Sequence, residues 1–182
     1  VVHCRNSFDE MNLITQHIPD KAAVADELQE MLEETGESSV IKWTLMNQPE
    51  SLGNEIAGLI GAKKNCISVG DTLSLKVYQA LASALQLAPK SGAVLSDEGN
   101  FPSDIYAANS LLKQKNLPPV RLVKSDSLES EIKKGDVSIL MLTQVDYRTG
   151  YVHDMTRLTN LAKKEGIITI WDLAHSIGSL CL

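Results

Sequence analysis

The chain has 182 residues, which is long enough for one domain with a hydrophobic core. Its composition, 43% hydrophobic and 22% charged, is typical of a soluble globular protein. A net charge of −6 without a long basic run argues against a nucleic-acid-binding protein, and no apolar run approaches the ~18–20 residues that cross a bilayer.

The first residues and the cysteines bear on the cellular location. The first five residues lack the charged and apolar regions of a signal peptide. The three cysteines, Cys4, Cys66 and Cys181, are odd in number and share no metal-like spacing. Cys66 lies in an apolar run, where a buried thiol is expected. We therefore expect a reducing, cytoplasmic compartment.

Taken in chain order, the apolar spacing predicts helices that alternate with short strands. Asp20 can cap a first helix, and a second helix follows Pro49 and ends near Gly61. Asp154 caps the last helix, which ends at Gly166 in a left-handed conformation. The other predicted elements are strands at residues 67–69, 93–95, 120–123, 137–142 and 167–171, and helices at residues 73–88, 104–115 and 128–134.

Apolar strands separated by helices predict an α/β fold, with a mostly parallel sheet and helices on both of its faces. All 182 residues are expected to form a single domain. Ligands of such sheets bind beyond the carboxyl ends of the strands. The candidate site residues are therefore those that follow Val69, Leu95, Leu142 and Trp171.

The first of these strand ends has the sequence Gly-Asp-Thr-Leu-Ser at residues 70–74 and leads directly into a helix. Glycine, hydroxyl groups and free amides at a helix N-terminus can form a phosphate site. A capping turn, with Asp71 or Thr72 as the N-cap, explains the same residues and is the commoner structure. Both interpretations stay open at this point.

Two further strand ends carry aromatic and polar residues. After the second one, Phe101 could stack on a ring and Asp104 could hold a charge, although Ser103 or Asp104 could equally cap the following helix. After the third, Thr143 is expected to face the ligand, and a Tyr-Arg pair follows at residues 147–148. For each of these hydroxyl and carboxylate groups, the alternative to ligand binding is an ordinary structural role, such as a helix cap or an internal hydrogen bond.

Asp172 ends the last strand, where a carboxylate is costly to bury unless a cation or several donors meet it. The protonated ring nitrogen of pyridoxal phosphate (PLP) is such a cation. His175 lies three residues further on, either near the same site or as a core histidine. A metal bound by Asp-x-x-His lacks an evident third ligand, because His153 and the two earlier histidines have unrelated contexts.

Three segments resemble kynureninase, in the family's order. They are Asn-Phe-Pro-Ser-Asp at residues 100–104, Val-Asp-Tyr-Arg-Thr-Gly at 145–150 with His-Asp-Met at 153–155, and Trp-Asp-Leu-Ala-His-Ser-Ile-Gly at 171–178. The third segment is shared with relatives that include cysteine desulfurases, whereas the first two favour kynureninase. The resemblance extends from about Trp43 to Leu182.

This resemblance implies the large domain of an aspartate-aminotransferase-type PLP enzyme, which forms a homodimer in the full-length protein. The implied reaction is hydrolysis of the Cβ–Cγ bond of L-kynurenine, or of 3-hydroxykynurenine, to an anthranilate and L-alanine in tryptophan degradation. Phe101 would stack on the pyridine ring and Asp172 would pair with its nitrogen, with Asp104 nearby. The residues that the resemblance assigns to PLP are Leu73, Ser74, Phe101, Asp104, Thr143, Asp172 and His175.

Two departures from the family are expected to matter. The family's Schiff-base lysine follows the Asp-x-x-His segment, and no lysine of this chain has that position; Lys163 and Lys164 are expected on a helix surface. The N-terminal substrate-binding segment and the C-terminal small domain are also expected to be absent. We therefore expect an incomplete large domain without its catalytic residue and without kynurenine hydrolysis. The alternatives are another PLP enzyme of this fold, such as a cysteine desulfurase, or a non-catalytic remnant.

Overall fold

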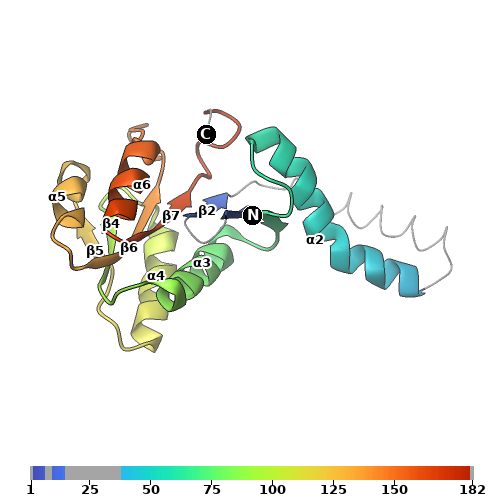
Figure 1. Cartoon of the computed structure of the whole chain (residues 1–182), viewed down its shortest axis with the longest axis horizontal. Coiled ribbons are helices and arrows are strands. Elements are labelled where there is room, and N and C mark those ends of the chain that lie inside the picture. Colours follow the sequence, from blue (N-terminus) through green and yellow to red (C-terminus); the bar gives the residue numbers. More distant parts are fainter. Residues whose placement is uncertain (1, 7–9, 15–37, 181–182) are drawn as a thin grey trace.

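The computed structural model describes residues 2–6, 10–14 and 38–180, so the helix expected from Asp20 lies outside the described residues. Strands and helices alternate along most of the chain (Figure 1). The elements are β1 (Val2–Asn6), β2 (Glu10–Ile14), α2 (Ser38–Ile60), β3 (Ile67–Val69), α3 (Leu73–Leu87), β4 (Ala93–Asp97), α4 (Pro102–Gln114), β5 (Arg121–Val123), a 3-10 turn (Ser125–Ser127), α5 (Leu128–Ile132), β6 (Val137–Thr143), α6 (Met155–Lys164) and β7 (Ile168–Asp172).

The strands form one seven-stranded sheet in the order β3-β1-β2-β7-β6-β4-β5. The pairings β2–β7, β7–β6, β6–β4 and β4–β5 are parallel, whereas β1 is antiparallel to both β2 and β3. Two successive antiparallel pairings restore the original direction, so β3 runs the same way as β7. The expected mostly parallel sheet is confirmed, and the carboxyl ends of β3, β7, β6 and β4 lie at the same edge.

Helices cover both faces of the sheet, as expected: α3 and α4 lie on one side, and α5 and α6 on the other (Figure 1). Alternate residues of β4, β6 and β7 enter the two resulting cores. In β7, Ile170 packs with α3 and α4, whereas Trp171 packs with α5 and α6. Burial of these two apolar layers is the main source of stability that the fold offers.

The helices follow the apolar periodicity of the sequence. In α3 the buried residues Val77, Ala80, Leu81 and Ala84 recur at helical spacing, which is why one face of the helix packs on the sheet. In α6 the Asp154 carboxylate accepts a hydrogen bond from the amide of Arg157 and caps the helix, as predicted. α2 has 23 residues, but no helix in the described ranges combines such length with enough hydropathy to cross a membrane.

Several predictions about the ends of helices and about burial are wrong, most clearly for α2, which begins at Ser38. α2 does not begin after Pro49 but contains it, because an internal proline costs one backbone hydrogen bond without forbidding the helix. α4 begins at Pro102, with Phe101 at the N-cap, so neither Ser103 nor Asp104 caps it. Cys66 is half-buried rather than buried, since it lies just before β3 at the sheet's edge.

Two glycines of α2 offer a matched test of how closely this helix packs on β3. A Cβ atom built at Gly53 would collide with the carbonyl of Ile67, whereas nothing lies within 4 Å of one at Gly58. We expect Gly53→Ala to destabilise the protein by about 1–3 kcal/mol through this overlap. Gly58→Ala is expected to stabilise it by about 0.5–1 kcal/mol, because alanine favours the helix. Urea unfolding measures both, and equal effects would contradict the packing of α2 on β3.

Candidate functional site

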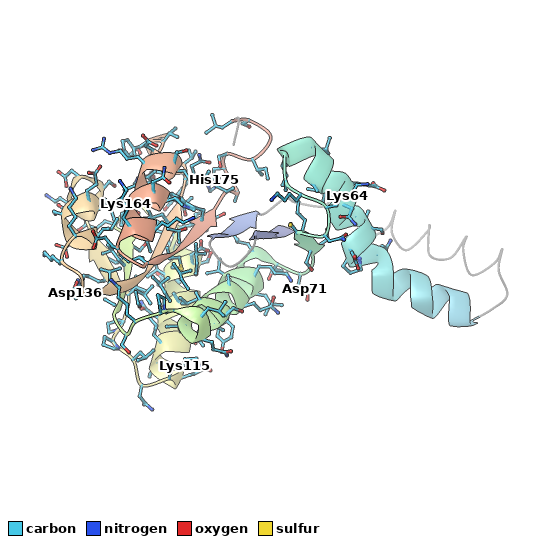
Figure 2. All side chains as sticks on the ribbon, viewed as in Figure 1. Lys64, Asp71, Lys115, Asp136, Lys164 and His175 are labelled. Atoms are coloured by element: carbon cyan, nitrogen blue, oxygen red, sulfur yellow. The ribbon has the colours of Figure 1, made fainter. Side chains whose placement is uncertain are left out.

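The carboxyl ends of β4, β6 and β7 lie side by side, and each strand ends in polar residues. Figure 2 labels Asp136, just before β6, and His175, shortly after β7. Because β6 and β7 are parallel, Asp136 marks the amino ends of these strands and His175 marks their carboxyl ends. Because side chains alternate along a strand, Thr143 and Asp172 face the side of α3 and α4. Asp97 faces the side of α5 and α6. The edge therefore carries one polar cluster on each face of the sheet.

On the α3 and α4 side, two carboxyl groups come together. Asp104, in the first turn of α4, is 1% exposed, and Asp172, at the end of β7, is 3% exposed. Asp172 Oδ1 accepts a hydrogen bond of 2.8 Å from the amide of Ala174. Asp172 Oδ2 is buried and accepts no hydrogen bond from the described residues. Apart from a proton shared with Asp104, this buried oxygen has no donor among the described residues.

Burial, together with the proximity of the two groups, shifts their pKa values. Burial first, and then the negative charge of neighbouring Asp172, raise the pKa of Asp104 to about 8. Burial also raises the pKa of Asp172, while the Ala174 amide and nearby His175 oppose that rise. One proton shared by two carboxyl groups relieves their repulsion. Near neutral pH the pair therefore carries about one negative charge, which suits a cation that also donates a hydrogen bond.

Asn100 joins the residues around this pair, although the sequence analysis assigned it no role. Its side-chain amide donates to Ser96 Oγ at 2.8 Å and to the carbonyl of Met141 at 3.1 Å. Its Oδ1 accepts the Phe101 amide at 2.6 Å and the Thr143 hydroxyl at 2.7 Å. The Thr143 hydroxyl thus donates its single proton to Asn100, although Thr143 is the register partner of Asp172 on the neighbouring strand. Asn100 sets the positions of Phe101 and Thr143.

Three rings gather above the carboxyl edge. The centroids of Phe101 and Tyr147 lie 4.9 Å apart in an edge-to-face arrangement, and those of Phe101 and His175 lie 5.9 Å apart. Tyr147 and His175 are stacked with centroids 6.3 Å apart. Such aromatic contacts stabilise by about 0.5–1.5 kcal/mol each. Phe101 and His175, which the sequence analysis named, are therefore neighbours, and Tyr147 joins them.

The turn from β3 into α3 lies at the same edge but further along the sheet. Thr72 is the N-cap of α3 and makes no side-chain cap hydrogen bond; Ser74 is exposed, and Leu73 packs at the margin of the core formed with α4. Two strands, β1 and β2, separate β3 from β7, which corresponds to about 14 Å at the usual spacing of strands. The first amides of α3 have no partner within the helix, as at any helix N-terminus.

The polar cluster on the other face was missed by the sequence analysis, which described His153 as lying in an unrelated context. His153 Nε2 lies 2.9 Å from Asp97 Oδ2, and the two side chains are 3% and 2% exposed. Ser125 Oγ donates to the same Asp97 oxygen at 2.8 Å. A sequence signal was present, since Ser96 and Asp97 end a buried strand in succession and buried polar groups require partners. The identity of those partners was not visible in the sequence.

The chain is similar to curated proteins named Kynureninase. It is 37% identical to the one from Deinococcus radiodurans over 158 residues, which cover 82% of this chain and 38% of that relative. It is 33% identical to one from Burkholderia mallei over 168 residues, which cover 88% of this chain and 40% of that relative. The chain thus spans about two fifths of the length of these relatives. No protein-family model matches it.

Two solved structures share the fold. The apo structure of a cysteine desulfurase from Thermococcus onnurineus matches with a TM-score of 0.63 and 20% identity, over 87% of this chain and 42% of that chain. A serine palmitoyltransferase from S. paucimobilis, which holds a bound compound of PLP and myriocin, matches with a TM-score of 0.53 and 20% identity, over 93% and 43%. At such identities the likeness concerns the fold alone, and it confirms the expected aminotransferase-type α/β fold.

Proposed function

Because this chain is homologous to about two fifths of kynureninase, we propose that it forms part of the PLP-binding large domain of an enzyme that hydrolyses L-kynurenine to anthranilate and L-alanine. The observation that carries this proposal is the buried Asp104–Asp172 pair, in which Asp172 Oδ2 has no donor among the described residues other than a proton shared with Asp104. The proposal includes a cytoplasmic homodimer, as the resemblance implies.

The pair fits a protonated pyridine ring. A pyridinium N–H provides one hydrogen-bond donor and one positive charge, which are the two features that Asp172 Oδ2 and the singly charged pair lack. Asp172 would accept the ring N–H, and Asp104 would hold the shared proton or release it when the cation binds. Bound PLP supplies an electron sink for the carbanions formed when the Cβ–Cγ bond breaks.

The other residues of the site would bind and orient the cofactor. Phe101 would stack on the ring from the position that Asn100 sets, and His175 and Thr143 would contact it from β7 and β6. The free amides near Leu73 and Ser74 at the start of α3 would bind the phosphate, since helix N-termini favour anions. The residue types support these roles. So does the position of the four segments, after β3, β4, β6 and β7, at the same edge of the sheet.

Two alternative functions give different outcomes in one experiment. The natural protein that contains this chain is purified, its PLP content is measured by absorbance, and it is incubated with L-kynurenine, 3-hydroxykynurenine or L-cysteine. We expect PLP-dependent release of fluorescent anthranilate or its hydroxy derivative. Sulfide release from cysteine alone would instead support a desulfurase. A protein that neither binds PLP nor turns over any of these substrates would be a non-catalytic relative, and the proposal would be wrong.

The control for this experiment is Asp136→Asn. Asp136 is a carboxylate exposed on the surface, where it pairs with Arg121 at 2.8 Å before β6, at the far end of the strands from the site. Exposed ion pairs contribute little to stability. We therefore expect this variant to keep the PLP content and the anthranilate release of the unmodified protein. A loss of either property in a site variant can then be attributed to the changed site residue.

A further inference from the structure

The three-ring group depends on a hairpin that spans residues 144–153. Its base is attached to the sheet, since the Gln144 amide donates to the carbonyl of Asp172 and the His153 amide donates to the carbonyl of Gln144, both at 2.9 Å. Val145 and Val152 form an antiparallel bridge, and the Asp146 amide donates to the Tyr151 carbonyl. Tyr147 lies on this hairpin and reaches over Phe101 and His175.

Side chains connect the hairpin to the end of β4 and to the residue that follows it, at two places. Near the tip, exposed Arg148 donates to the carbonyl of Glu98 at 3.2 Å and pairs with Asp146. At the base, His153 Nε2 forms a hydrogen bond of 2.9 Å with Asp97 Oδ2, and both side chains are buried. Exposed polar contacts contribute little, whereas removing one partner of a buried hydrogen bond leaves the other polar group unsatisfied and costs about 1–3 kcal/mol. The Asp97–His153 contact is therefore the stronger of the two ties.

The pair lies outside the ligand site itself. Asp97 faces α5 and α6, where Ser125 also donates to it, while the Asp104–Asp172 pair and Phe101 are associated with the opposite face. The His153 ring is held between Tyr151, at a centroid distance of 5.0 Å, and Trp171, at 6.4 Å. Trp171 is the residue directly before Asp172, so the same contacts brace the end of β7.

We propose that Asp97 and His153 are positioning residues, which hold the 144–153 hairpin so that Tyr147 closes the ring group against Phe101 and His175. The inference rests on the proposed function, because the ligand that this ring group would receive is PLP. Among the described residues, the side-chain hydrogen bonds of Asp97 and His153 go to each other and from Ser125, and none goes to a residue assigned to the cofactor, so we infer that these side chains act through the hairpin. Loss of their contact is expected to release Tyr147 while leaving Asp104, Asp172 and Asn100 in place.

The test compares three variants of the natural protein that contains this chain. His153→Phe keeps a ring between Tyr151 and Trp171 but removes the hydrogen bond to Asp97, whereas His153→Gln keeps a side-chain donor. Ser138→Ala is the matched control, since Ser138 is also buried and this change removes its hydrogen bond to the carbonyl of Gly92, at the amino end of β6. For each variant, hydrogen exchange of residues 144–153, the PLP dissociation constant and the unfolding midpoint are measured.

We expect His153→Phe to increase exchange in the hairpin at least tenfold and to raise the PLP dissociation constant about tenfold, which is about 1.4 kcal/mol. His153→Gln is expected to restore a large part of both, and Ser138→Ala to lower only the unfolding midpoint. A PLP dissociation constant unchanged in His153→Phe, or raised equally in Ser138→Ala, would overturn the inference and leave the proposed function standing. Absence of PLP binding in the unmodified protein would overturn both.

Discussion

Replacing Asp172 with asparagine is expected to raise the PLP dissociation constant of the enzyme by two to three orders of magnitude and to reduce kynurenine hydrolysis at least as much. Asp172 is 3% exposed and has one oxygen without a donor, so a bound pyridinium loses its charged partner and its acceptor together. Removing one partner of a buried ion pair costs about 3–5 kcal/mol. Equilibrium dialysis of PLP and anthranilate fluorescence measure the two effects.

The same substitution should have the opposite effect on the protein without cofactor. Asparagine can still accept the Ala174 amide, but it removes the buried negative charge beside Asp104. We expect the free energy of unfolding of the apo protein to rise by about 1–2 kcal/mol. A variant that binds PLP normally, or that loses PLP only because it no longer folds, would contradict the role given to Asp172. Asp136→Asn again serves as the surface control.

The stability of the apo protein is expected to fall as the pH rises from 5 to 7, by about 2 kcal/mol. Asp104 has its pKa raised from 3.8 to about 8 in the folded protein, mainly by burial, so in this range the folded state holds a proton that the unfolded state has released. More protons on the native state give a negative slope, of up to about 1.4 kcal/mol per pH unit. Urea unfolding at several pH values measures the slope.

The two carboxylates with lowered pKa values, Asp136 and Asp146, act outside this window. Arg121 and Arg148 lower the pKa values of Asp136 and Asp146, so their stabilising contributions are complete above the ordinary aspartate pKa and are lost only in acid. In Asp104→Asn the decline between pH 5 and 7 should largely disappear. A decline that persists unchanged in this variant would assign it to other groups. Added PLP should also flatten it, because the cation replaces the shared proton.

Local sequence patterns predicted the main elements and their arrangement in layers. Val77, Ala80, Leu81 and Ala84 predicted the buried face of α3, and the apolar run from Val137 predicted β6, which is buried throughout. These predictions succeed because spacing along the chain determines which side chains share a face. Boundaries were less accurate: β4, β6 and β7 each extend into polar residues, since backbone pairing continues where apolar character ends.

For the candidate site, sequence determined the residue types at each strand end and the resemblance to kynureninase, including Asp104, Asp172, Phe101 and His175. Only the tertiary structure decided which groups meet: that Asp104 lies against Asp172, that Asn100 links Phe101 to Thr143, and that His153 pairs with Asp97. The reason is physical. Periodicity along one chain specifies an element and its buried face, whereas a contact across the sheet depends on strand order and register, which arise only when distant strands pair.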